Sequence, residues 1–231
     1  MMIRFKFTRG PELKYISHLD LLRVFERSVK RSRIPVAYSQ GFNPRQKIVF
    51  GLPMSIGLTS DCEYADIELA EDIIPDDFIK AMNEGLPKGV RVVEAVHMTA
   101  KGNIMNQIKS ARYEILFEII NANESIEISD YVNGMLNKKE IIVMKKSKKG
   151  KKPVDIRPLI YSLSAIEEES GLYKLEAFIS AGAQDNLRAD LLMEAFGQET
   201  GLDIRIISQH RKALYTSVLN RWKDPFEVAN D

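Results

Sequence analysis

The order of sequence periodicities along the first hundred residues limits this chain to a small set of folds. Residues 2–9 alternate apolar and polar or charged side chains, as a strand with one buried face does. Residues 17–34 follow with apolar side chains at helical spacing, between a capping Ser17 and a stop at Pro35. Strand-like stretches at 47–56 and 63–69, a helical stretch at 75–85 and a β-rich stretch at 90–97 complete the series. The predicted order is β-α-β-β-α-β, in which two helices cover one face of an antiparallel sheet and the other face is open or available to a partner.

A second series of the same kind follows the polar segment at 99–110. It comprises a strand at 112–120, a helix at 129–137, a strand at 140–145, a mixed stretch at 155–164, a strand at 173–180, a helix at 188–200 and a strand or strand pair at 203–215. We therefore predict an α+β fold with tandem ferredoxin-like (βαββαβ) modules and antiparallel sheets, at residues 1–105 and 106–231. Residues after Leu219 are predicted to form a frayed or partner-ordered tail.

Composition narrows the functional classes. The formal charge is +1, from 33 basic and 32 acidic side chains, so affinity for an anionic polymer depends on where the charges lie. A single cysteine and three scattered histidines predict no disulfide framework, no metal site and no cofactor. The N-terminus lacks the continuous apolar run of a secretion signal, and no apolar stretch is long enough to span a membrane. A cytoplasmic protein is expected.

The first predicted helix carries a cationic face. Spacings of three, four and seven place four basic side chains on one side, roughly opposite Leu22, Phe25 and Val29. These four are Arg23, Arg27, Lys30 and Arg31. They are predicted to contact phosphates, although a solvated helix surface would have the same pattern.

The loop after this helix combines amides, cations and aromatic rings. Gly41 permits unusual dihedral angles and Pro44 sets a turn. The side chains predicted to bind nucleic acid are Tyr38, Gln40, Phe42, Asn43, Arg45 and Lys47. The sequence of the loop matches neither the Walker motif nor the dinucleotide-binding fingerprint. The alternative is an ordered connection with Phe42 packed into the core.

A lysine tract lies in the second predicted module. It places six lysines within residues 145–152, and such a density of charge has to be solvated, so a loop is expected. The lysine tract gives salt-dependent affinity for nucleic acid, or serves as a solubilising hairpin tip. The lysines are Lys145, Lys146, Lys148, Lys149, Lys151 and Lys152.

Three carboxylates crowd one predicted strand. Alternation sends Asp66 to the face opposite Glu68, so that a catalytic carboxylate pair is not implied. One of Glu63, Asp66 and Glu68 is expected to pair with the arginines of the first helix.

Several sequence blocks resemble the radical-SAM-linked conserved hypothetical family, a domain of unknown function fused to, or encoded beside, radical S-adenosylmethionine proteins. The N-terminal blocks are Tyr15-Ile-Ser-His-Leu-Asp20, Val36-Ala-Tyr-Ser-Gln-Gly-Phe-Asn-Pro44, Phe50-Gly-Leu-Pro53 and Glu63-Tyr-Ala-Asp-Ile-Glu-Leu69. The resemblance implies a radical-SAM partner, and the family's genomic context favours RNA. The cysteine triplet that ligates a radical-SAM cluster is absent, so this polypeptide is not itself the radical enzyme.

Three functions remain open. The leading hypothesis is a non-catalytic accessory module that binds RNA or a ribonucleoprotein and works with a radical-SAM partner. The first alternative is a metal-independent RNA-processing endonuclease, with His18 as general base assisted by Tyr38, Ser39 or Lys47. The second is a protein–protein adaptor without nucleic-acid binding, which predicts an exposed apolar patch on the sheet or around Trp222 and Phe226.

Overall fold

The computed structural model describes residues 1–100, 102–120, 126–147, 150–169 and 171–230, and shows an α+β protein with mostly antiparallel sheet. The predicted α+β class is thereby confirmed. The chain divides into two compact units: unit 1 comprises Met1–Lys109 and Arg211–Asp231, and unit 2 comprises Ser110–His210. The predicted boundary differs in two respects, because it assigned residues 106–109 and 211–231 to the second module.

Unit 1 begins with the predicted alternation of strands and helices. Its elements are β1 (Met2–Arg9), α1 (His18–Arg31), β2 (Ile48–Phe50), β3 (Leu58–Glu68), α2 (Pro75–Gly85), β4 (Val90–Met98) and the short α3 (Ile104–Gln107), after a 3-10 turn at Pro11–Leu13. The strands run in the order β4-β1-β3. β2 pairs with one part of β3, and the second part of β10 lies beside another part of β3. The β1–β3, β1–β4 and β2–β3 pairs are antiparallel.

The strand expected at 47–56 is shorter than predicted. It ends at Phe50. Gly51 N still donates to Tyr64 O of β3, and its backbone passes so close to α3 that a Cβ there would be 2.9 Å from Ile104 Cγ1. Pro53 also has no N–H to donate to a sheet ladder. The chain therefore turns away from β3 before Gly57, whose N–H donates to Lys14 O.

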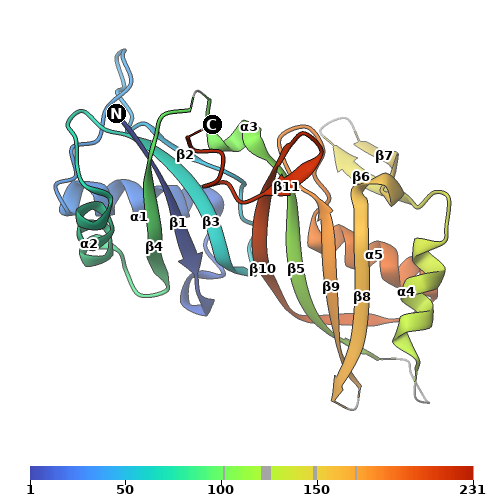
Figure 1. The fold of residues 1–231 in the computed structure, drawn as a ribbon. Helices are drawn as coiled ribbons and strands as arrows, with labels where there is room; N and C mark the ends of the chain where they lie inside the picture. The colour runs from blue at the N-terminus through green and yellow to red at the C-terminus, as the bar shows by residue number, and fades with distance from the viewer. Residues whose placement is uncertain (101, 121–125, 148–149, 170, 231) are drawn as a thin grey trace. The chain divides into compact units, whose positions relative to one another are not determined.

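An aromatic cluster forms the core of unit 1. Phe5 and Phe7 of β1 contact Phe25 of α1, with ring centroids 5.8 and 4.8 Å apart, and Phe78 of α2 packs 5.3 Å from Phe5. The helices α1 and α2 lie on the same face of this sheet (Figure 1). As predicted, Ser17 caps α1, and its Oγ accepts a hydrogen bond from Asp20 N.

The C-terminal segment packs on the opposite face of the unit-1 sheet. Alternation places Arg4 on the face that Phe5 does not use, and there its guanidinium donates to Pro225 O at 2.8 Å. The Tyr64 hydroxyl donates to Asp224, and the ring of Phe226 lies 5.1 Å from that of Tyr64. Ala229 is fully buried. The prediction of a frayed tail is wrong, because this segment finds partners within its own chain.

Unit 2 contains a small hairpin outside its main sheet. The elements are β5 (Ile108–Ile119), α4 (Ile128–Leu136), β6 (Ile142–Ser147), β7 (Gly150–Asp155), β8 (Ile160–Glu169), β9 (Leu172–Ser180), α5 (Ala189–Thr200) and β10 (Ile204–Val218), with β11 (Arg221–Lys223) after it in unit 1. The strand order is β10-β5-β9-β8, and β6 pairs with β7 alone.

The sequence therefore misassigned the strand that follows α4. The residues at 140–145 belong mostly to the hairpin strand β6, and the mixed stretch at 155–164 supplies β8 of the main sheet. Asp155 closes the base of the hairpin, because its Oδ1 accepts hydrogen bonds from Ile141 N and Arg157 N. The Arg157 guanidinium donates to Leu136 O and Ile160 O, which fixes where β8 begins.

Arg33 ends α1 in a left-handed conformation. Its φ is 53°, its N–H donates to Lys30 O, and Ile34 N donates to Val29 O, which is the Schellman arrangement usually completed by glycine. We expect Arg33→Gly to raise the free energy of unfolding by up to about 1 kcal/mol, because glycine adopts this conformation without a Cβ penalty. Urea denaturation measures the change. Arg33→Ala removes the same charge but keeps the penalty, so an equal gain from alanine would refute this explanation.

Candidate nucleic-acid interface

The cationic face of α1 is solvent-exposed, as its spacing predicts. The exposed members are Arg23, Arg27, Lys30 and Arg31, on the side opposite the buried Leu21, Phe25 and Val29. Leu21 is fully buried and Leu22 only partly, so Leu21 takes the place of Leu22 on the predicted apolar side. Arg33, which we did not assign to this face, is also exposed just beyond the helix.

Most of these cations are available to a ligand. Arg23 pairs with Asp20 at 2.9 Å, but both side chains are more than half exposed, so solvent and salt screen the pair. Within the described residues, Arg27, Lys30 and Arg31 form no ion pair. We call the four predicted cations of α1 the α1 cationic face.

The segment after the helix folds back on itself as a hairpin loop. Tyr38 and Gln46 form an isolated antiparallel bridge, and inside it Ser39 N donates to Arg45 O at 2.8 Å. Ser39 Oγ in turn accepts from Arg45 N at 3.0 Å. Gly41, with φ of 117°, makes the tight turn that this closure needs. Residues 38–47 are called the 38–47 loop below, and Figure 1 shows this light blue loop projecting from unit 1.

Gln46 joins the 38–47 loop to α1. It is buried, and its Nε2 donates to Glu26 O at 3.1 Å, next to the cationic face. Gln46 was not among the predicted site residues, because a buried positioning amide has no pattern that distinguishes it in a sequence. This contact fastens the loop to the helix that carries the α1 cationic face.

The predicted binding side chains of the loop point outward. Phe42 is 106% exposed and Tyr38 is 43% exposed. The alternative in which Phe42 packs into the core is therefore wrong. The remaining predicted residues, all exposed, are Gln40, Asn43, Arg45 and Lys47. Lys47 forms an ion pair with Glu68 at 2.9 Å, whereas Arg45 forms none within the described part of the chain.

The lysine tract lies on the β6–β7 hairpin of unit 2. Lys145 is opposite Lys152, and Lys146 is opposite Lys151. Lys145 Nζ donates to Asn186 O at 3.4 Å, and Lys152 is exposed. The side chains of Lys146 and Lys151 are not described, and Lys148 and Lys149 lie outside the described residues. Lys145, Lys146, Lys151 and Lys152 thus lie on two paired strands, where like charges directly opposite one another repel. The loop predicted for the tract is wrong at these four residues.

His18 does not meet the groups that the endonuclease alternative assigns to it. Its ring packs against Phe50, and its Nδ1 is buried with no hydrogen-bond partner in the described structure. Burial lowers the pKa of His18, and the nearby Arg9 lowers it further, so the imidazole is neutral at pH 7. The proposed assistants are held elsewhere, since Tyr38 and Ser39 close the loop and Lys47 pairs with Glu68.

The three carboxylates expected to pair with the helix arginines bind three other cations, none of them on α1. Glu63 binds Arg211, and Asp66 binds Arg4. Glu68 binds Lys47 of the loop. The predicted pairing with the helix arginines is wrong, and Arg27, Lys30 and Arg31 have no carboxylate partner among the described residues.

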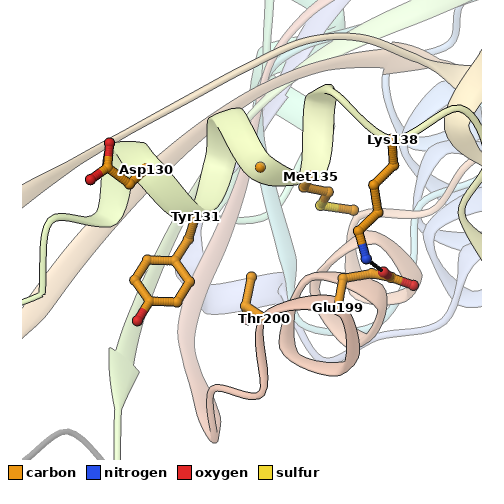
Figure 2. Close-up of a pocket in the computed structure, with 7 residues that line it drawn as sticks. Asp130, Tyr131, Met135, Lys138, Glu199 and Thr200 are labelled. Atoms are coloured by element: carbon orange, nitrogen blue, oxygen red, sulfur yellow. Dashed lines mark hydrogen bonds and ion pairs between the residues drawn. The ribbon is translucent and has the colours of Figure 1, made fainter.

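A shallow pocket of about 340 Å³ lies between α4 and α5 of unit 2 (Figure 2). Figure 2 shows Tyr131 of α4 and Thr200 of α5 beside it, with an ion pair between Lys138 and Glu199 at one end. The site residues predicted from the sequence do not line it.

Two further properties concern the described residues only. No group of three or more His, Cys, Asp or Glu side chains among them is arranged to hold a metal ion. No helix found in that part of the chain has the length and apolarity needed to cross a membrane.

The two aromatic residues that the adaptor alternative names in the C-terminal segment differ in exposure. Phe226 packs against Tyr64, whereas Trp222 is 42% exposed. Phe226 is therefore in part packed against unit 1 itself.

The fold defines a mixed α+β protein built on antiparallel sheet, with an exposed cationic face on α1. The chain belongs to the family described as "Uncharacterized protein conserved in bacteria (DUF2344)", whose sequence model matches residues 2–189. No curated protein matches the chain.

Two solved structures are similar to this chain at low sequence identity. A chain of a Cbf5-Nop10-Gar1 complex has a TM-score of 0.50 and 12% identity, over 90% of this chain and 48% of that one. A chain of an archaeal box H/ACA sRNP Nop10-Cbf5 complex has a TM-score of 0.44 and 9% identity, over 90% of this chain and 46% of that one. The present chain thus spans about half the length of these solved chains.

Proposed function

We propose that the protein is a non-catalytic accessory module that binds RNA or a ribonucleoprotein through the α1 cationic face and the 38–47 loop. One observation carries the proposal: Arg27, Lys30 and Arg31 are exposed without a carboxylate partner among the described residues, and Gln46 holds an aromatic- and amide-bearing loop beside them. Cations provide phosphate contacts, and exposed rings and amides contact bases. The lysines of the β6–β7 hairpin would add sequence-independent affinity.

Two finer points belong to the same proposal. Both units are proposed to be ferredoxin-like modules, because each has two strand–helix–strand passages and a strand order in which the first strand lies between the third and the fourth. In unit 2 this description treats the β6–β7 hairpin as an insertion. A radical-SAM protein is proposed as the partner on the family resemblance of the N-terminal sequence blocks.

The fold similarity to a chain of a Cbf5-Nop10-Gar1 complex is compatible with this reading. At 12% identity it concerns the arrangement of the backbone, and the proposal of RNA binding depends on the charges and exposed side chains of unit 1.

A charge-matched pair of triple variants tests the proposal. Arg27→Ala/Lys30→Ala/Arg31→Ala removes three cations from the interface, and Lys80→Ala/Lys88→Ala/Arg91→Ala removes three exposed cations from the surface of α2 and its flank on β4. We expect the wild type to bind labelled RNA with an affinity that falls steeply with salt. The interface variant should flatten the slope of log affinity against log salt by about 2, since each lost contact to a single strand removes about 0.7.

Fluorescence anisotropy measures the RNA affinity of the wild type and both variants at a series of salt concentrations. The series runs from roughly 50 to roughly 200 mM, a range over which such affinities change steeply. Equal losses in the two triple variants would show that net charge alone matters, and no binding by the wild type would refute the proposal. The same samples on a denaturing gel should show intact RNA. Cleavage that is lost in His18→Ala would instead favour the endonuclease alternative.

A further inference from the structure

The tip of the 38–47 loop presents one large aromatic side chain to solvent. Phe42 is the most exposed of the large hydrophobic residues among the described part of the chain, at 106%. The flanking Gly41 and Asn43 are polar or small, so no neighbouring apolar side chain on the loop covers the ring. A phenylalanine in this position is not stabilised by burial of its ring, and the face of the ring is accessible to a flat partner.

From this arrangement we propose that the 38–47 loop selects RNA with unpaired nucleotides, by stacking an unpaired base on Phe42. The inference rests on the proposed function, because the α1 cationic face supplies the backbone contacts. It adds the class of RNA: single strands, loops or bulges, and not continuous duplex.

The loop is organised before it binds. The hydrogen bonds between Ser39 and Arg45 close its neck, and Gln46 fastens the neck to the backbone of α1. Pro44 further restricts the chain two residues after the ring. Since these contacts already limit the backbone on both sides of Phe42, stacking a base on it orders few additional groups, which lowers the entropic cost of binding.

The polar groups beside Phe42 favour the same class of RNA. Gln40 and Asn43 are exposed amides that both donate and accept hydrogen bonds, as the edges of bases do. In duplex RNA the pairing edges are occupied, the bases are stacked on one another, and the deep major groove is closed to side chains. An unpaired nucleotide offers both its edge and its face to this loop.

Exposed cations that attract a phosphate backbone lie on the same loop and on the helix to which the loop is fastened. Arg45 is exposed on the closing side of the loop and has no ion pair within the described residues. Glu26, whose carbonyl holds Gln46, is directly followed by Arg27 of the α1 cationic face. A nucleotide stacked on Phe42 therefore has cations within the same part of unit 1 for its own and adjoining phosphates.

Two labelled RNAs test the inference: a single strand without self-complementarity, and the duplex of that strand with its complement. We expect the wild type to bind the single strand more tightly at a fixed salt concentration, and Phe42→Ala to weaken that binding about 5- to 150-fold, as the loss of a stacked base does. Duplex binding should be unchanged in this variant, because phosphate contacts remain. Phe42→Trp should retain the preference, whereas Phe42→Leu, which keeps an apolar side chain without a π-face, should behave as alanine does.

The outcomes separate the inference from the function on which it rests. Retention of full single-strand affinity in Phe42→Ala, or equal weakening toward both RNAs, would overturn stacking while the effect of the Arg27/Lys30/Arg31 variant still supported RNA binding. Absence of binding to either RNA by the wild type would refute both proposals. Because the Phe42 side chain is fully exposed, the variants should unfold at the wild-type urea concentration, which confirms that any loss arises at the interface.

Discussion

Replacing Asp66 with alanine is expected to lower the free energy of unfolding by about 3–5 kcal/mol, because it leaves a buried cation without its partner. Arg4 is fully buried, and its guanidinium donates to both carboxylate oxygens of Asp66, at 2.8 and 3.1 Å. The carboxylate also accepts a hydrogen bond from Ile104 N at 2.8 Å. The substitution thus removes the acceptor for two polar groups that water does not reach.

Urea denaturation of the wild type and Asp66→Ala measures this effect. Glu68→Ala is the matched control, since Glu68 lies on the same strand and forms an ion pair with Lys47 in which both side chains are about 40% exposed. That pair should contribute at most about 1 kcal/mol. Equal losses in the free energy of unfolding would show that burial does not make the Arg4–Asp66 pair more stabilising than the exposed Lys47–Glu68 pair.

Arg211→Met is expected to destabilise unit 1 by a similar amount at neutral pH, about 3–5 kcal/mol, and by less in acid. Arg211 Nη1 donates to both oxygens of the buried Glu63, at 2.7 and 2.8 Å. Burial raises the pKa of Glu63, and the Arg211 guanidinium opposes that rise. Without the cation the pKa of the folded state rises further.

The pH dependence follows from that direction. A carboxyl whose pKa is raised in the folded state keeps its proton there and releases it on unfolding, so stability falls as pH rises above the unfolded pKa of about 4.3. The gap between wild type and Arg211→Met should therefore widen from about pH 4.5 to about pH 7.5, at up to roughly 1.4 kcal/mol per pH unit. Below the unfolded pKa the variant's loss should be smallest.

Lys212→Met serves as the control for Arg211→Met. Lys212 is the next residue along β10, and its ion pair with Asp61 is exposed on both sides. Its loss should cost at most about 1 kcal/mol at either pH. A gap for Arg211→Met that stayed constant with pH would show that Glu63 does not take up a proton when its partner is removed.

Local patterns predicted the elements whose determinants are close together in the sequence. The alternation in β1 and the Ser17 cap of α1 are both present in the structure. Each depends only on residues a few positions apart in the sequence. The cationic face of α1 follows from helical spacing alone. These features need no information about distant segments.

The features that were missed depend on distant partners. Arg4 alternates with apolar residues and so reads as a solvent-facing strand residue, yet Asp66 and Pro225 bury it. The β6 segment has the pattern of a sheet strand, but Asp155 closes it into a separate hairpin. The exposure of Phe42 was left open by the sequence, because the contact that fixes the loop is a hydrogen bond from Gln46 to a helix carbonyl. Contacts of this kind leave no periodic signal.

Unit 1 draws its residues from both ends of the chain, and this has a consequence for protein synthesis. At about 5–20 residues per second, a ribosome reaches Arg211 on the order of 5–20 s after Lys109. During that interval Glu63 lacks its cation and Arg4 lacks Pro225, whereas all of Ser110–His210 becomes available before either partner. The nascent chain should therefore be able to complete unit 2 first, and unit 1 should complete its buried contacts only after Arg211 and Pro225 have been synthesised.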